Sequence, residues 1–369
     1  MVTLAALAAR YDAGSSLYVT PVAFATGDAA RALADAGEAV SLAGGPGAFT
    51  AAEVALRRDG HVDTAIASVA AIARLAAGGD AAGAALHRWL TALSAEPPAF
   101  AGRGGPQVMG IVNVTPDSFS DGGDRFDPDA AVAAGEAMTA AGAALVDVGG
   151  ESTRPGSVPV GEAEELRRVI PVVTRLARAG VAVSVDTSRA AVMRAAVDAG
   201  AAVVNDVTAL RDPAAMATVI DRAVPVVLMH MQGEPRTMQR DPSYVSAPHD
   251  IFDFLADRVA VLRRAGVPSS RIAVDPGIGF GKTIAHNLAI LRALAVYAAL
   301  GVPLLVGVSR KGFIGRLGGG AAPKDRLGGS LAGALWALAR GASILRVHDV
   351  AETVRAVALW RALEEGASP

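Results

Sequence analysis

Residues 181–230 read VAVSVDTSRAAVMRAAVDAGAAVVNDVTALRDPAAMATVIDRAVPVVLMH, and this stretch decides the fold. Three short apolar runs alternate in it with two longer stretches of helical character. Continuous runs of Val, Ile and Leu that alternate with helices are typical of parallel strands covered by helices. The stretch therefore predicts consecutive strand–helix units of a parallel sheet.

The same unit recurs on both sides of this stretch. Eight apolar runs are strand candidates: Val108–Val114, Ala144–Val148, Val181–Val185, Ala202–Asn205, Val226–Met229, Ile272–Val274, Leu304–Val308 and Ile344–Val347. Helical sequence follows them at 129–141, 161–178, 189–199, 213–222, 249–265, 284–299, 328–340 and 351–364. Eight units in roughly 260 residues predict an α/β fold, a closed (β/α)8 TIM barrel over residues 107–364. A doubly wound open sheet is the alternative that the pattern leaves open.

An N-terminal extension, residues 1–100, precedes the barrel. Turn-forming residues between Glu96 and Pro106 separate the two parts. In the extension we expect a strand at 17–24, which Pro21 would place at a sheet edge. Helices are expected there over residues 27–37, 65–77 and 83–94. No motif in the extension indicates a role, and the barrel is expected to hold the whole active site.

Composition excludes several classes of protein. Of the 369 residues 52% are hydrophobic, 19% charged and 4% aromatic, which indicates a folded chain with an aliphatic core. The net charge of −2 predicts no nucleic-acid or membrane partner. The absence of cysteine excludes thiol nucleophiles and thiolate metal sites. Without a signal-peptide pattern at the N-terminus, a cytoplasmic location is expected.

Polar residues gather where the predicted strands end. They are Asn113, Asp147, Glu151, Asp186, Asn205, Asp206, His230, Asp275, Ser309, Arg310, Lys311, Arg346 and His348. In a barrel the C-terminal strand ends meet at one rim, which is where active sites of this fold lie. The sequence therefore predicts an active site that residues distant in the chain build together.

Three of these residues suit a polar heterocycle. Asp186 and Asp275 offer carboxylates that accept two parallel N–H bonds from a guanidine-like edge, and Asn205 offers a donor and an acceptor. The alternative for Asp186, which precedes Thr187-Ser188, is that it caps the following helix.

A second set is cationic and suits phosphoryl oxygens. Its members are Arg310, Lys311, Arg346 and His348. The alternative is that Arg310 and Arg346 form structural ion pairs with acids of the rim. The Gly277–Thr283 segment is similar to a nucleotide-binding loop, but Pro276 stands where that loop needs its first glycine.

Several long motifs resemble the signatures of the dihydropteroate synthase family. They are MGIVNVTPDSFSDGG at 109–123, GGESTRPG at 149–156, VDT at 185–187, ND at 205–206, LMHMQG at 228–233, DPGIGFGK at 275–282, SRK at 309–311 and RVHDV at 346–350. They follow the order of the family and cover about residues 107–364. The resemblance implies a transferase of folate biosynthesis, which joins (7,8-dihydropterin-6-yl)methyl diphosphate to 4-aminobenzoate and releases pyrophosphate.

The resemblance also implies roles for individual residues. The pterin would be held by Asp186, Asn205, Asp275 and Lys311, with Met229 packed on its ring. The diphosphate would be held by Asn113, Thr153, Arg346 and His348, and Asn113 would also bind a Mg²⁺ cofactor. The 4-aminobenzoate pocket would contain Phe119, Thr153, Arg154, Pro155, Phe280, Ser309 and Arg310. The resemblance makes Asp186, Lys311, Arg346 and His348 the expected catalytic residues.

One position departs from the family, and two other functions remain open. Many members have a hydroxyl residue after Ser-Arg-Lys, where this chain has Gly312, so backbone N–H groups at the next helix would have to bind the aminobenzoate carboxylate. A methyltetrahydrofolate-using methyltransferase and a non-catalytic pterin-binding homologue are the alternatives. The family implies a homodimer, for which helix 328–340 is a candidate face.

Overall fold

The computed structural model describes residues 2–115, 127–151, 160–234 and 236–365. The barrel strands are β5 (Gln107–Asn113), β6 (Leu145–Gly149), β7 (Val183–Asp186), β8 (Val203–Asp206), β9 (Val226–Met229), β10 (Ile272–Asp275), β11 (Leu305–Val306) and β12 (Ile344–Val347). All eight predicted strands are present.

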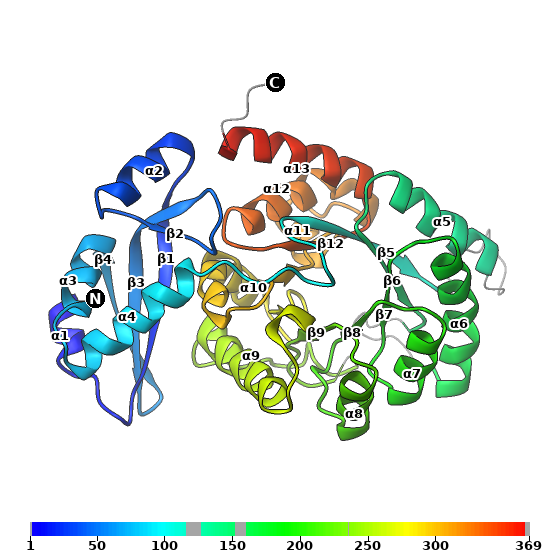
Figure 1. Ribbon diagram of the computed structural model, residues 1–369, viewed down its shortest axis with the longest axis horizontal. Coiled ribbons are helices and arrows are strands. Elements are labelled where there is room, and N and C mark those ends of the chain that lie inside the picture. Colours follow the sequence, from blue (N-terminus) through cyan, green and yellow to red (C-terminus); the bar gives the residue numbers. More distant parts are fainter. Residues whose placement is uncertain (1, 116–126, 152–159, 235, 366–369) are drawn as a thin grey trace.

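These strands form one parallel sheet in the order β10-β9-β8-β7-β6-β5-β12-β11. A parallel bridge from Val274 to Leu304 joins its two edges, and the Val274 N–H donates to the Pro303 carbonyl at 2.9 Å. The sheet therefore closes into the predicted barrel (Figure 1), and the open-sheet alternative is wrong.

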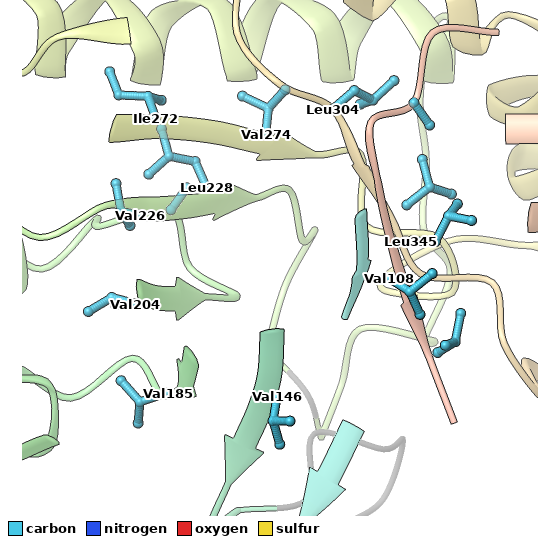
Figure 2. Packing of buried hydrophobic residues seen from close by; sticks show 14 of the residues in the cluster. Val108, Val146, Val185, Val204, Val226, Leu228, Ile272, Val274, Leu304 and Leu345 are labelled. Carbon is cyan, nitrogen blue, oxygen red and sulfur yellow. The ribbon is translucent and has the colours of Figure 1, made fainter. Parts of the chain in front are cut away.

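Two apolar layers stabilise the barrel. Between strands and helices lies a large buried cluster, part of which Figure 2 shows with Val146, Val204, Leu228 and Ile272 among its labelled members. Inside the barrel lies a smaller cluster from the beginnings of the strands: Met109, Leu145, Val203, Val227, Ala273, Leu305 and Ile344. Alternate residues of each strand serve the two layers, which explains why the strands are apolar throughout.

Phe100 completes the inner cluster. It is 1% exposed and packs against the strand beginnings from the segment that the sequence indicates as a linker. The turn that holds it has positive φ at Ala101 (50°) and Gly102 (75°), with paired backbone bonds between Phe100 and Arg103. Phe100 is therefore part of the core, because it fills the N-terminal end of the barrel.

Helices surround the barrel as the pattern predicts. They are α5 (Pro128–Ala140), α6 (Glu162–Arg178), α7 (Ala190–Asp198), α8 (Pro213–Asp221), α9 (Ala247–Arg264), α10 (Ile284–Arg292), α11 (Gly312–Leu317), α12 (Leu327–Leu338) and α13 (Val350–Glu365), with 3₁₀ turns η2 (Ser269–Arg271), η3 (Leu294–Leu300) and η4 (Pro323–Asp325). The helix predicted over 284–299 ends at Arg292 and continues as η3, whose end Gly301 adopts a left-handed conformation. No helix in the described ranges is long and apolar enough to cross a membrane.

The extension folds as an antiparallel sheet with helices. Its elements are α1 (Leu4–Ala8), β1 (Ser16–Ala25), α2 (Gly27–Asp35), β2 (Val40–Ser41), β3 (Ala48–Arg58), β4 (His61–Ser68), α3 (Val69–Ala76) and α4 (Ala81–Ser94). β3 pairs with β1, β2 and β4, so β1 is an edge strand, as Pro21 predicts.

The expected helix over 65–77 is wrong in its first turn, because Ala65–Ser68 belongs to β4. A two-residue turn joins β3 to β4, with positive φ at Asp59 (50°) and Gly60 (75°). Asp-Gly is a strong hairpin signal. The hairpin was not predicted because the sequence on both sides is rich in alanine, which favours helices.

Candidate active site

Four polar side chains from four barrel strands form one network at the C-terminal rim. Arg346 of β12 donates from Nε to Asp147 Oδ2 at 2.6 Å and from Nη2 to Asp186 Oδ2 at 2.8 Å. Asn205 of β8 donates from Nδ2 to the same Asp147 oxygen at 3.0 Å. Asp186 and Asn205 are register partners in neighbouring strands. The barrel therefore brings together residues up to 199 positions apart in sequence.

The network holds two carboxylates and one guanidinium. Asp147 is fully buried, and within the described residues its Oδ1 has no hydrogen-bond partner. Burial raises the pKa of Asp186 above its usual range, Arg346 opposes that shift, and Asp147 adds to it. A cationic or N–H-rich ligand edge would relieve this excess of negative charge. Asp147 is a strand-end residue in the sequence, but no role was predicted for it; its signal is a lone carboxylate inside the apolar run LVDVG.

Asp275 lies at the end of β10 and is 6% exposed. Its Oδ1 accepts the Gly277 N–H at 2.7 Å, and burial raises its pKa. Gly277 has φ of 68°, and a Cβ there would overlap the His230 carbonyl oxygen. The glycine is required because two loops touch at this point.

An apolar wall adjoins these acids. Met229 packs with Val207, Met231 and Met238 in a small cluster that Phe280 joins. Lys311 Nζ lies 4.3 Å from the centroid of the Phe280 ring, a cation–π contact. Polar acids beside an apolar wall and a lysine suit a flat heteroaromatic ligand.

The remaining predicted cations have partners within the protein. His348 Nδ1 lies 3.1 Å from Ser309 Oγ, so these two predicted residues are neighbours. Arg310 pairs with Asp349 through two bonds, one of them from Nε to Oδ2 at 3.0 Å. The structural ion pairs considered as the alternative for Arg310 and Arg346 are therefore present. Arg346 has two of its five N–H donors engaged within the part of the chain that the structure describes.

Lys282 is a buried residue for which the sequence implied no role. Its Nζ contacts His230 Nδ1 at 3.0 Å and the carbonyls of Phe280 at 2.8 Å and His230 at 3.3 Å. Burial lowers the pKa of Lys282 to about 7 and that of His230 to about 2. His230 and Lys282 thus share a hydrogen bond, and the pair connects the end of β9 to the loop after β10. The only feature of the sequence that pointed to Lys282 is its charge inside the Gly-rich motif DPGIGFGK.

Asp206 follows Asn205 but is not part of this network. Both carboxylate oxygens of Asp206 bind the turn that follows β8, through Thr208 and Leu210, so Asp206 is structural. Asn113 ends β5 beside its register partner Gly149. Phe119, Thr153, Arg154 and Pro155 lie outside the described residues. α11 begins at Gly312 and is six residues long.

Comparisons with known proteins agree with this arrangement. Residues 109–348 match the model of the family described as pterin binding enzyme. Dihydropteroate synthase of Escherichia coli K12 is 47% identical over 253 residues, which are 68% of this chain and 89% of that protein. The Haemophilus influenzae dihydropteroate synthase is 46% identical and covers 70% of this chain and 94% of its own length.

Solved structures are similar as well. Xanthomonas albilineans dihydropteroate synthase with 4-aminobenzoic acid has a TM-score of 0.69 and 49% identity, over 74% of this chain and all of that one. The same enzyme in complex with 7,8-dihydropteroate has a TM-score of 0.64 and 48% identity, over 72% and 95% of the two chains.

Proposed function

The chain belongs to the family of pterin binding enzymes, and from that membership we propose that it is an enzyme with dihydropteroate synthase activity. It joins (7,8-dihydropterin-6-yl)methyl diphosphate to 4-aminobenzoate and releases pyrophosphate. The observation that carries the proposal is the joint position of Asp186, Asn205 and Asp275 at one barrel rim in a chain 47% identical to such an enzyme.

The pterin is proposed to bind between the acids and the apolar wall. Its 2-amino-4-oxo edge presents parallel N–H donors, which match the carboxylates of Asp186 and Asp275 and the amide of Asn205. The buried acids attract that edge because their charge is only partly balanced. Met229 and Lys311 complete this subsite, with Met229 packed on the ring.

The diphosphate is proposed to lie against Arg346, His348 and Asn113, with Thr153 from outside the described residues. Cleavage of the C–O bond to diphosphate is the difficult step, since an arylamine is a weak nucleophile. Cations that meet the departing negative charge lower that barrier. The positive charge left on the methylene group conjugates with the electron-rich dihydropterin, the amine nitrogen then forms the C–N bond, and its proton is released.

Mg²⁺ is proposed as a cofactor because the side chain of Asn113 can supply an oxygen ligand. The Asn113 side chain offers a hard oxygen donor at the rim, and among the described residues no three His, Asp or Glu side chains could hold a metal by themselves. Mg²⁺ commonly takes few protein ligands together with phosphate oxygens, so a single asparagine fits. When bound, the ion supplies positive charge to the leaving diphosphate.

4-Aminobenzoate is proposed to bind beside Phe280, Ser309 and Arg310; the family resemblance adds Phe119, Thr153, Arg154 and Pro155, which lie outside the described residues. Ser309 contacts His348, which would join this subsite to the diphosphate subsite. Arg310 is held by Asp349, so its guanidinium is already oriented.

A coupled assay of pyrophosphate release tests the function. We expect release only when the pterin diphosphate, 4-aminobenzoate and Mg²⁺ are all present, together with formation of dihydropteroate. A methyltetrahydrofolate-using methyltransferase would release no pyrophosphate, and a non-catalytic homologue would bind the pterin without turnover.

Replacement of one pterin acid tests the site. Asp186→Asn should weaken binding of a pterin by about 1.5–3 kcal/mol, the range for a hydrogen bond to a charged group. Calorimetry with a pterin that lacks the diphosphate measures this directly. An unchanged affinity would remove Asp186 from the pterin site.

A homodimer is proposed through α11 and α12. Leu317 and Trp336 are 61% and 41% exposed beside a groove of about 510 Å³ that these helices form. Apolar surface of this kind is typical of subunit interfaces. Sedimentation of the wild type and of Trp336→Glu tests the dimer, which the charge should dissociate. The cytoplasmic location expected from the sequence stays a prediction.

A further inference from the structure

One arginine of the extension forms ion pairs with the barrel. Arg57 of β3 donates from Nη1 to Asp250 Oδ1 at 2.8 Å and from Nη2 to Asp253 Oδ2. Both acids lie in the first turns of α9, and the arginine side chain is 22% exposed. In Figure 1 the extension accordingly stands beside the helices α9 and α10 of the barrel.

Asp250 also binds the backbone of the segment that precedes α9. While its Oδ1 accepts from Arg57, its Oδ2 accepts the backbone N–H groups of Val245 at 2.9 Å and Ser246 at 3.2 Å. One carboxylate therefore joins the extension to the segment 236–246, which leads into α9. Because carboxylates that accept several N–H bonds are held tightly, this segment is fixed at its end by a group that Arg57 orients.

The segment 236–246 in turn supports the loop after β10. Tyr244 donates from Oη to the Gly281 carbonyl at 2.7 Å, and Gln239 donates from Nε2 to the Gly279 carbonyl at 2.7 Å. These two carbonyls flank Phe280, whose ring lies 4.3 Å from Lys311 Nζ.

The loop after β10 has no room to shift towards the loop after β9, which contains Gln232. A Cβ at Gly281 would overlap the Gln232 carbonyl oxygen. The backbones around Gly281 and Gln232 are in close contact, which leaves little space there to absorb a displacement of Tyr244.

We propose that the extension is a working part of the catalytic unit, in which Arg57 acts through Asp250 and Tyr244 to position Phe280 in the aminobenzoate subsite. Arg57 is thus a positioning residue that lies outside the barrel. The inference rests on the proposed function for the identity of that substrate.

The chain offers a matched control. Asp253 accepts from Arg57 and from Tyr18 Oη at 2.8 Å, so it also joins the extension to the barrel. Within the described residues it has no hydrogen bond to the segment 236–246. Asp253→Asn therefore weakens the same interface and leaves the connection to Phe280 in place.

Steady-state kinetics on the full chain test the proposal. Arg57→Met should raise KM for 4-aminobenzoate by about three- to tenfold and leave kcat within about twofold, an effect of the size carried by packed side-chain networks. Arg57→Lys, which keeps a charge, should recover part of the loss, and Asp253→Asn should change KM by less than about twofold. Equal KM changes in Arg57→Met and Asp253→Asn would overturn the proposal.

Two further measurements keep it testable if one variant folds poorly. Tyr244→Phe by itself should raise KM for 4-aminobenzoate. The double variant Arg57→Met/Tyr244→Phe should have a KM close to that of Tyr244→Phe, and additive effects on KM would contradict action through Tyr244. Amide hydrogen exchange at residues 277–287 should rise in Arg57→Met and stay unchanged in Asp253→Asn, and a rise confined to the extension would also overturn the proposal. If the wild type releases no pyrophosphate, the proposed function fails, and the exchange experiment still tests the connection.

Discussion

The barrel rim and the extension differ in how deeply their ion pairs are buried. In the barrel, Asp147, Asp186 and Arg346 are mostly buried and meet at one rim. In the extension, ion pairs such as Arg10–Asp63 lie on the surface, with both side chains at least 40% exposed. Arg57 is the exception, and its two acid partners belong to the barrel. At the rim and at the boundary between the two regions, the partly or fully buried charges therefore have partners from distant segments, which offset the cost of removing them from water.

Removal of the central cation of the rim should have the largest effect. Arg346→Met leaves Asp147 and Asp186 without their shared partner, so unfolding in urea should show a loss of about 3–5 kcal/mol. Binding of the diphosphate substrate should weaken more than that of a pterin alone. If the free energy of unfolding fell by less than about 1 kcal/mol, the ion pairs of Arg346 would contribute no more than exposed pairs do. The contrast between the rim and the extension would then be wrong.

Phe100 tests where the extension ends and the barrel begins. Phe100→Ala should lower the free energy of unfolding by about 3–5 kcal/mol, since it empties the N-terminal end of the barrel. Phe100→Leu is the control and should lose less than about 1.5 kcal/mol if the site repacks. If both variants match the wild type, this segment is a linker after all, as the sequence predicts.

The pH dependence of stability tests the effect of burial on Lys282. Its pKa is lowered to about 7 in the folded protein, whereas an unfolded lysine keeps an ordinary pKa near 10.4. Between these values the unfolded chain binds the proton and the folded chain does not, so stability rises with pH. From pH 7 to 9 the gain should be on the order of 2 kcal/mol. Lys282→Met should lose this rise; an identical pH dependence in the variant would contradict the assignment.

The smallest effect is expected on the outer surface of the extension. Arg10→Ala removes an exposed ion pair with Asp63, so stability should change by about 0–1 kcal/mol and turnover should stay the same. Urea unfolding and the pyrophosphate assay measure both. A loss as large as that of Arg346→Met would mean that exposure does not distinguish the two regions.

Local pattern was sufficient for most of the fold. Short apolar runs followed by amphipathic stretches predicted all eight barrel strands, because hydrophobic periodicity reports which face of an element is covered. The hairpin of β3 and β4 was missed although Asp59-Gly60 signals it, since the flanking alanines favour helix more than strand. The end of the helix after β10 was also misplaced, because a change from α to 3₁₀ geometry leaves little trace in residue type.

The sequence by itself determined that the chain contains a barrel and which residues stand at its strand ends. Only the tertiary structure decided the distant partners of the charged residues: Arg310 with Asp349, Arg346 with Asp147 and Asp186, and Lys282 with His230. It also decided that Phe100 enters the barrel and that Arg57 reaches α9. The physical reason is range. Strand and helix patterns depend on neighbours a few residues away, whereas the pairing of a charge depends on distances in space between segments as far apart as Asp147 and Arg346, and these distances exist only after the barrel has closed.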